Sequence, residues 1–535
     1  MDASWSPNGE EPTAEVLEGE LLGPRSPVLG KVISEGTSPS FTDIAFRLEA
    51  NAAVFPGELV AAHAHLDGAD AWVVCRVLDV HEVNPHEDAL SSTVRDVLTF
   101  DTRYAPEGSS TVIYRIAACE PVEEIPFDAH GLGSPHEVRT LPLAGGTVVR
   151  AEGEMISRAL GLLADPHDGV DIGVVHGTDT PAVLVSNAIQ RHMLIVGGTG
   201  SGKSYTRGVL AEELHCLGTC QVNIDVNREM VDATAQLGGR TLVPGDDFTL
   251  ALSSLTREDV LEMVEQNGIR RGTNMETLIG AAIDALHDDI RFGRRQIFGV
   301  DDLVDQIEAM APAMGMQAAG TLHPAKTRTA ALRQRAYIGA PTPWRALLQP
   351  GAVVNIDCWS LSLSDLRIVV AGVARELQYV VRNVADIPFV ALSIDEFHLV
   401  CPNEQNLVST QVLREIARIG RHFGLGLILT TQSPADVDRA ILKRLLTRFV
   451  HTIEPDQLDS LKGVFADAPP EIIHRLPRLP VGTCLLSGVA ETVRHATVVD
   501  VRRRRTSHGG HAPDMFATIR KLGWAAKKTL PDHGA

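Results

Sequence analysis

The sequence is poor in aromatic residues, which make up 4% of its 535 residues, and it has no long apolar run. The longest apolar stretches, such as 368–374, fall far short of the roughly 18 to 20 residues of a membrane-spanning helix. The N-terminus lacks the basic, apolar and small-residue order of a signal peptide. We therefore expect a cytoplasmic protein without a membrane partner, and at this length about three compact units.

Cysteine is also scarce, and the seven cysteines are an odd number scattered through mostly apolar segments. This pattern is typical of reduced thiols rather than of a disulfide framework. His215, Cys216 and Cys220 lie close together in the sequence, but no second pair of ligands accompanies them. We therefore do not expect a zinc site there.

The sequence also has no excess of basic residues. It contains 48 Lys and Arg residues and 68 Asp and Glu residues, which gives a net charge of −20. This balance argues against a protein whose whole surface binds nucleic acid. It does not exclude a locally basic channel, since a DNA path depends on where the arginines lie.

The stretch His192–Ser204, HMLIVGGTGSGKS, turns a short apolar run directly into a glycine-rich loop. It fits the pattern G-x-x-x-x-G-K-[ST], in which glycines aim backbone N–H groups at the phosphates of a nucleoside triphosphate. The lysine of this pattern reaches the β- and γ-phosphates, and the following hydroxyl takes a magnesium position. A predicted strand at 193–196 and a predicted helix at 203–217 direct a helix N-terminus toward the phosphates. The predicted nucleotide-binding residues of this stretch are Gly197, Gly198, Thr199, Gly200, Ser201, Gly202, Lys203, Ser204 and Tyr205.

Two other interpretations of this loop are weaker. An accidental glycine-rich turn would not need a strand before it and a helix after it. A dinucleotide-binding G-x-G-x-x-G loop starting at Gly198 would need a third glycine where Lys203 stands.

The patterns along the chain predict an α/β fold with a mainly parallel sheet, preceded by a small β-barrel and carrying a helical insertion. With the phosphate loop after its first clear strand, the α/β part resembles RecA-like domains. Residues 1–24 contain six acidic and no basic side chains, which is typical of a disordered tail. Short alternating strands follow, and two of their histidines, His63 and His65, are expected to be exposed polar positions rather than metal ligands. The expected parts are a tail at 1–25, a barrel at 26–140, ATPase segments at 141–250 and 346–500, the insertion at 251–345 and a C-terminal brace or tail at 501–535.

The strand VALSIDEF ends in two carboxylates, Asp395 and Glu396. By itself, an apolar run followed by Asp-Glu is often only a strand end. In one α/β unit with a phosphate loop, we expect Asp395 to bind magnesium and Glu396 to orient and activate the attacking water.

A further strand at 425–431 leads to Gln432, a neutral polar group expected near the γ-phosphate, where it would sense hydrolysis. Arg421 precedes this strand. Its spacing alone allows two roles equally: a cation that neutralises the transition state in a neighbouring subunit, or a cation that satisfies the C-terminus of a helix.

Taken together, these motifs resemble the HerA branch of the HerA and FtsK class of hexameric DNA-pumping ATPases, over nearly the whole chain. The resemblance is carried by GKVIS, FRLE, PGELV and VVCRVLDV in the barrel, and then by RHMLIVGGTGSGKS, IDVNREM, LSIDEFHLV, IGRHFGLGLILTTQSPADVD, TRFVHTI, LPVGTCLLSG and VRRRRTSHGG. Two motifs depart from the family. DVNRE lacks the histidine and glycine usual between its acids, and TTQSP has serine where arginine commonly follows the glutamine.

The resemblance implies a role for each matching residue. Lys203 and Ser204 would bind ATP and Mg²⁺, and Asp395 and Glu396 would be the metal-binding and water-activating carboxylates. Asp225 and Glu229 would support the nucleotide site, and Gln432 would be the sensor. Arg421 would be an arginine finger acting on a neighbouring subunit, and Arg191 would help to complete a nucleotide site.

The family also implies a homohexamer that moves double-stranded DNA and works with a nuclease similar to NurA, or with another effector, in DNA end processing or anti-phage defence. Arg502–Arg505 would belong to a brace between neighbouring subunits. The alternative is an ATPase ring that scaffolds and switches an effector with little translocation. A membrane-anchored pump is disfavoured by the lack of spanning segments. From charge alone, the candidates for DNA contact are Arg291, Arg294, Arg295, Lys326, Arg328, Arg333 and Arg335, each of which could equally lie on a solvated helix face.

Overall fold

The computed structural model describes residues 27–34, 38–66, 68–83, 114–384, 386–387, 389–403, 405–458 and 468–507, together with Gly509 and Lys521. The chain forms two compact units. One comprises Met1–Gly202 and Leu446–Arg502, and the other comprises Lys203–Leu445 and Arg503–Ala535. The predicted acidic tail and most of the predicted C-terminal brace or tail lie outside the described residues.

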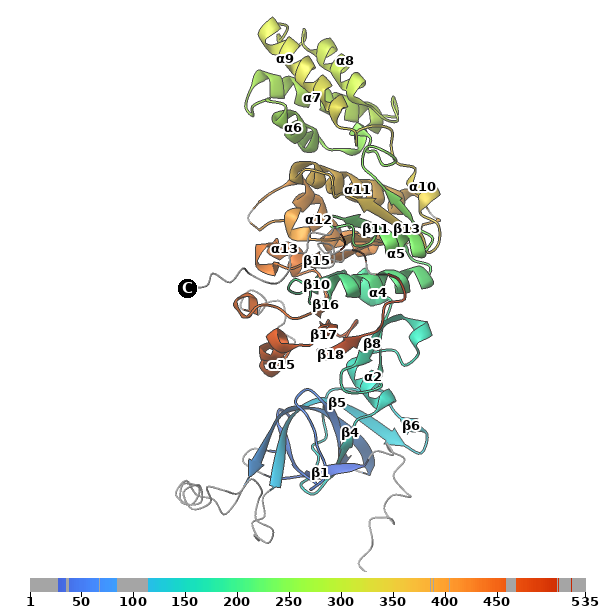
Figure 1. Ribbon diagram of the computed structural model, residues 1–535, viewed down its shortest axis with the longest axis vertical. Helices are drawn as coiled ribbons and strands as arrows, with labels where there is room; N and C mark the ends of the chain where they lie inside the picture. The colour runs from blue at the N-terminus through green and yellow to red at the C-terminus, as the bar shows by residue number, and fades with distance from the viewer. Residues whose placement is uncertain are drawn as a thin grey trace, which may run out of the picture. The chain divides into compact units, whose positions relative to one another are not determined.

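The first unit begins with a closed antiparallel barrel, as the strand pattern predicts (Figure 1). Its strands pair in the order β2-β1-β7-β3-β4-β5, and β5 returns to β2 to close the barrel. A short β6 (Gly131–Leu132) pairs with β5. The barrel strands are β1 (Val28–Val32), β2 (Ile44–Leu48), β3 (Leu59–Leu66), β4 (Ala69–Val83), β5 (Tyr114–Asp128) and β7 (Thr147–Arg150).

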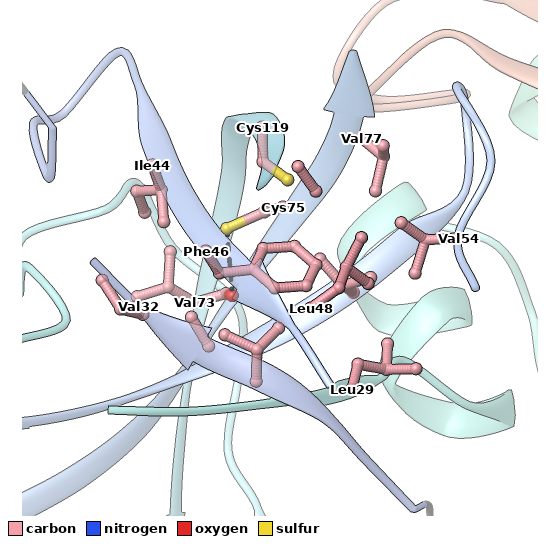
Figure 2. Close-up of a cluster of buried hydrophobic side chains, with 14 of the residues drawn as sticks. Leu29, Val32, Ile44, Phe46, Leu48, Val54, Val73, Cys75, Val77 and Cys119 are labelled. Atoms are coloured by element: carbon pink, nitrogen blue, oxygen red, sulfur yellow. Dashed lines mark hydrogen bonds between the residues drawn. The ribbon is translucent and has the colours of Figure 1, made fainter. Parts of the chain in front are cut away.

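The barrel is held together by a closed apolar core (Figure 2). Phe46 is fully buried at its centre, with Val73 and Cys75 from β4 around it. On β1, a side chain at Gly30 would place its Cβ 2.0 Å from the carbonyl oxygen of Arg47, so the close approach of the paired strands β1 and β2 requires glycine here.

The remaining strands of the first unit pair in the order β10-β16-β17-β18-β8-β9. β10 and β16 are parallel, whereas the other pairs are antiparallel. The elements are α2 (Gly153–Leu160), β8 (Val170–Val175), β9 (Pro181–Leu184), α3 (Asn187–Gln190), β10 (Met193–Val196), β16 (Thr447–Val450), α15 (Pro470–Arg475), β17 (Thr483–Ser487) and β18 (Thr497–Val501).

The second unit contains a wholly parallel set of strands in the order β12-β13-β11-β14-β15. Strands β11, β13, β14 and β15 are buried along their whole length, as expected for strands covered by helices on both faces. The elements are α4 (Lys203–Cys216), β11 (Cys220–Asp225), α5 (Val231–Gln236), β12 (Arg240–Leu242), α10 (Trp344–Leu347), β13 (Val353–Asp357), α11 (Leu363–Asn383), β14 (Val390–Ile394), α12 (Val408–Ile419), β15 (Leu425–Thr431) and α13 (Arg439–Leu442). The predicted fold class is confirmed.

Four helices form the predicted insertion of the second unit as one group (Figure 1). They are α6 (Arg257–Gln266), α7 (Asn274–Arg291), α8 (Val300–Met310) and α9 (Ala319–Ala330). α9 ends at Ala330 and is followed directly by a 3₁₀ turn, Ala331–Gln334. None of the helices described is both long and apolar enough to cross a bilayer.

Candidate nucleotide site

The phosphate-loop glycines lie in the first unit, directly after β10. Gly200 and Gly202 adopt φ values of 75° and 116°, a region in which a side chain is strained. The N–H of Gly198 donates to the carbonyl of Thr452 over 2.8 Å, which fixes the start of the loop. Thr199 and Gly200 are exposed, Gly197 and Ser201 are buried, and Gly198 and Gly202 are half-buried.

The second unit begins with Lys203 and Ser204, the first two residues of α4. The first backbone N–H groups of a helix have no intrahelical partner, so the start of α4 favours an anion. Lys203 is buried, and desolvation lowers the pKa of its ammonium against the opposing attraction of Glu396, Asp395 and Glu229. The partly buried Ser204 lies beside it in the first turn. Tyr205 accepts a hydrogen bond at its hydroxyl from the N–H of Arg504 over 2.6 Å.

Asp395 follows β14 and is held from three sides. Its Oδ2 lies 3.3 Å from Nη1 of Arg207 and accepts a hydrogen bond from Nδ2 of Asn227 over 3.3 Å. Its Oδ1 accepts the N–H of Glu396 over 3.0 Å. Burial raises the pKa of the Asp395 carboxyl, while the Arg207 guanidinium opposes this shift. The carboxylate is therefore fixed in orientation at the end of the strand.

Glu396 has a backbone conformation that is rare for a residue with a side chain, φ 45° and ψ 47°. Desolvation, and then the charges of Asp395 and Glu229, raise the pKa of its carboxyl to about 7, although Lys203 and the backbone N–H of Gln432 favour the ionised form. Its Oε2 lies 3.4 Å from Nδ1 of His398 and makes no hydrogen bond within the described residues. A buried carboxylate with a pKa near neutrality is suited to accept a proton from water.

Asp225 organises a turn. It is fully buried, and its two oxygens accept the backbone N–H groups of Glu229 and Met230 over 3.1 and 2.9 Å. Nδ2 of Asn355 donates to Oδ2 over 3.2 Å. The turn so formed presents Glu229, whose Oε2 is buried and has no hydrogen-bond partner in the part of the chain that the structure describes.

The carboxyl end of β15 brings the predicted sensor to the same edge of the parallel sheet as Glu396. Thr431 is fully buried, and its Oγ1 lies 3.2 Å from Nδ1 of His398. The half-buried Gln432 follows directly. His398 therefore bridges the predicted water-activating residue and the sensor strand, because the same ring nitrogen faces both Glu396 and Thr431.

The two predicted arginines lie elsewhere. Arg421 is exposed in a 3₁₀ turn, Gly420–His422, at the amino end of β15, so the seven residues of β15 separate it from the carboxylates by roughly 23 Å. Arg191 precedes β10, at the opposite end of that strand from the loop, and its side chain pairs with Glu491. Neither arginine can serve the phosphate-binding end of its own strand.

The residues fit a magnesium ion that is held mainly by a bound nucleotide. No group of three or more His, Cys, Asp or Glu side chains within the described residues is arranged to hold a metal by itself. Mg²⁺ usually takes one or two protein oxygens together with phosphates and water. Asp395 and Ser204 supply such a pair of oxygen donors, and the neighbouring carboxylates Glu229 and Glu396 add negative charge.

Sequence reasoning missed three side chains that contact the carboxylates: Arg207, Asn227 and His398. Arg207 could have been predicted from the sequence, because a residue four positions after Lys203 in a helix lies on the same helix face. Asn227 lies inside the motif in which the departure from the family was noticed. His398 follows Glu396 by two residues, but only the fold brings it to Thr431.

Most candidate DNA-contacting residues of the insertion form an ion pair or a hydrogen bond with another residue of the chain. Arg294, Arg295, Lys326 and Arg333 pair with acidic side chains of the insertion, and Arg335 pairs with Asp365 of α11. The side chain of Arg328 donates to the carbonyl of Gly268. The exposed Arg291 has no ion-pair partner among the residues that the structure describes.

The two barrel histidines share one carboxylate. His63 Nε2 and His65 Nδ1 lie 3.0 and 2.7 Å from Oδ1 of Asp70. This arrangement explains both side chains without a metal ion. All seven cysteines are free thiols, and six of them are buried.

Comparison with known proteins identifies relatives of the chain. Residues 170–377 match the family described as "Helicase HerA, central domain". The chain is 22% identical over 393 residues to the DNA double-strand break repair helicase HerA of Sulfolobus acidocaldarius, which covers 70% of this chain and 77% of that protein. It is 23% identical over 411 residues to the protein of the same name from Saccharolobus solfataricus, which covers 74% of this chain and 80% of that protein.

A solved structure shares the fold. VirB4 of Thermoanaerobacter pseudethanolicus aligns with a TM-score of 0.50 and 14% identity, over 63% of this chain and 97% of that chain. The match to the central domain of HerA and the similarity to HerA proteins over most of the chain confirm the resemblance that the motifs indicate. The chain is an ATP-hydrolysing enzyme related to the HerA helicases.

Proposed function

We propose that the chain forms a homohexameric ring that uses Mg²⁺-dependent ATP hydrolysis to move double-stranded DNA. The observation that carries this proposal is the convergence of Lys203, Asp395 and Glu396 in one unit, with Gln432 at the end of the neighbouring strand. The names of the relatives, DNA double-strand break repair helicases, supply the DNA substrate. The seven free thiols support a reducing, cytoplasmic location.

Within the site, the residues would divide the chemistry. Lys203 and the loop would bind the phosphates, and Ser204 and Asp395 would hold Mg²⁺, which neutralises phosphate charge when bound. Glu396 would orient the attacking water and accept its proton. Arg421 of a neighbouring subunit would supply positive charge to the transition state, because its own strand separates it from its own carboxylates.

A nuclease partner similar to NurA, or another effector, is part of the proposal. The function would then be DNA end processing or anti-phage defence. The partner would convert movement of DNA into its degradation or into a defence response.

A second candidate function is a ring that scaffolds and switches an effector with little DNA movement. The observation that favours it is the engagement of six of the seven candidate DNA-contacting residues with acidic side chains or a carbonyl. Together with the net charge of −20, this leaves few cations of the insertion available to phosphates.

The rate of ATP hydrolysis with and without long duplex DNA separates the two functions. A translocase should hydrolyse ATP several-fold faster with duplex DNA, and this stimulation should disappear at high salt because phosphate contacts are screened. A rate that long duplex DNA leaves unchanged would reject the motor and favour the scaffold. Addition of EDTA should abolish hydrolysis in both cases, and resistance to EDTA would contradict the magnesium site.

A further inference from the structure

Arg207 is the largest side chain that is fully buried in the described part of the chain, and it lies against the proposed metal-binding carboxylate. It belongs to α4, three residues after Ser204, and is therefore a neighbour of Ser204 on the helix surface. Its Nε donates to Oγ of Ser393 over 3.1 Å, and its Nη2 donates to the carbonyl of Ile224 over 3.3 Å. Its Nη1 lies 3.3 Å from Oδ2 of Asp395.

These contacts connect three elements of the site. Arg207 links α4, which begins with the phosphate-binding Lys203 and Ser204, to β11 through Ile224 and to β14 through Ser393. The planar guanidinium uses three different nitrogens for these contacts, which a lysine could not reproduce. The distance between the Ser204 hydroxyl and the Asp395 carboxylate therefore depends on this side chain.

The charged groups near Asp395 also indicate that Arg207 acts on this carboxylate. Asp225 and Glu229 are both close enough to Asp395 to oppose its ionisation, and Arg207 is a buried cation that offsets them. Burying a guanidinium carries a desolvation cost, and well-packed apolar side chains often serve stability equally well. Packing alone is therefore a poor explanation for an arginine at this position.

We propose that Arg207 is a positioning residue that fixes the Asp395 carboxylate for Mg²⁺ in the nucleotide site. It does not touch the nucleotide. This inference rests on the proposed ATPase site and assigns to it a residue outside the family motifs used above.

The test compares Arg207→Met and Arg207→Lys with the wild type in the full-length protein. Binding of a fluorescent ATP analogue is titrated with and without Mg²⁺, and the Mg²⁺ concentration for half-maximal hydrolysis is measured separately. For Arg207→Met, we expect the Mg²⁺ requirement to rise about 10- to 100-fold, as for other residues that orient metal ligands. Binding of the analogue without Mg²⁺ should stay within about twofold, because Lys203 and the loop are unchanged. Arg207→Lys should be intermediate.

Two controls separate positioning from folding. Arg76 of the barrel is also buried and pairs with Glu120 over 3.2 Å, so Arg76→Met should lower thermal stability without changing the Mg²⁺ requirement. Ser393→Ala removes one hydrogen bond of Arg207 but keeps its charge, and it should raise the Mg²⁺ requirement only a few-fold. It also keeps the proposal testable if Arg207→Met does not fold.

A double variant shows whether Arg207 acts through Asp395. In an Asp395→Asn background, Arg207→Met should add no further loss of Mg²⁺-dependent analogue binding. An unchanged Mg²⁺ requirement in Arg207→Met and Ser393→Ala would overturn the inference while leaving the ATPase intact. A wild-type protein that does not hydrolyse ATP would instead reject the proposed function.

Discussion

Two sets of ion pairs in the second unit differ sharply in their surroundings. In the buried set, Arg207 and Asp395 have side chains that are 2% and 5% exposed. In the exposed set, on the helical insertion, Arg333 and Asp301 have side chains that are 53% and 79% exposed. Water screens the second kind of pair and leaves the first nearly unscreened. The candidate nucleotide site is therefore distinguished by buried charges and not by the number of charges.

The largest effect is expected for Glu396, the half-buried carboxylate that we propose activates water. Glu396→Gln keeps the shape of the side chain but removes its basicity, so turnover should fall about 10²- to 10⁴-fold while ATP binding persists. Turnover is measured by phosphate release, and binding by a fluorescent ATP analogue. Glu308→Gln on the insertion, where Glu308 pairs with Lys326 at the surface, is the matched control and should leave turnover unchanged. Hydrolysis by Glu396→Gln near the wild-type rate would contradict the assignment.

The next largest effect is expected for Arg421. This arginine is exposed in its own chain and would reach a nucleotide site only in a neighbouring subunit. Arg421→Ala should lower turnover about 10²- to 10³-fold, because a transition-state charge loses its partner. Mixing variant and wild-type subunits should lower activity more than in proportion to the variant fraction. Arg418→Ala, at the exposed last turn of α12, is the control and should show neither effect. Strict proportionality in the mixtures would reject an arginine finger.

The pH dependence of hydrolysis tests the burial of Glu396 directly. Its carboxyl has a pKa raised to about 7, and only the ionised form can accept a proton from water. The rate should therefore fall about tenfold for each pH unit below about 7 and level off above it. A rate that is constant between pH 5.5 and 7.5 would show that this carboxyl is not the base.

Stability should change in the opposite direction with pH. The folded-state pKa of Glu396 is raised to about 7 from 4.5, so its protonated form is favoured by folding. That contribution is complete below about 4.5 and is lost as pH rises through about 7. Glu396→Gln should therefore unfold at a temperature a few degrees above that of the wild type at pH 8, for a gain of about 1 kcal/mol after solvent screening. The difference should vanish near pH 4.5, and equal melting temperatures at pH 8 would contradict the pKa shift.

The smallest effect is expected for the exposed pairs of the insertion. Asp301→Asn and Asp284→Asn each remove a surface partner, of Arg333 and Arg257 respectively. Each should change the free energy of unfolding by no more than about 0.5 kcal/mol. Thermal or denaturant unfolding measures this change. A loss of several kcal/mol would mean that the two sets of ion pairs differ less than their exposure indicates.

Much of this architecture could be predicted from the chain. The apolar run before the phosphate loop predicts a strand with the observed bounds of β10. The run before Gln432 likewise predicts the observed bounds of β15. Alternating short strands indicated the barrel, although β7 was missed because four residues are too few to show a period. Asp395 and Glu396 were recognisable because strand ends of a parallel sheet share one edge. Their assigned roles, like those of Lys203 and Gln432, stay predictions until the variants are measured.

Local sequence patterns are enough to place these chemical groups next to a strand or a helix end, because loop glycines and strand periods act over a few neighbouring positions. The environments of these groups depend on the tertiary fold: the turn that occupies both oxygens of Asp225, the guanidinium of Arg207 against Asp395, and the surface partners of the insertion arginines. Burial, and with it the pKa of Glu396, depends on elements far apart in the chain. No local pattern contains that information, because desolvation is a property of the assembled sheet and its helices.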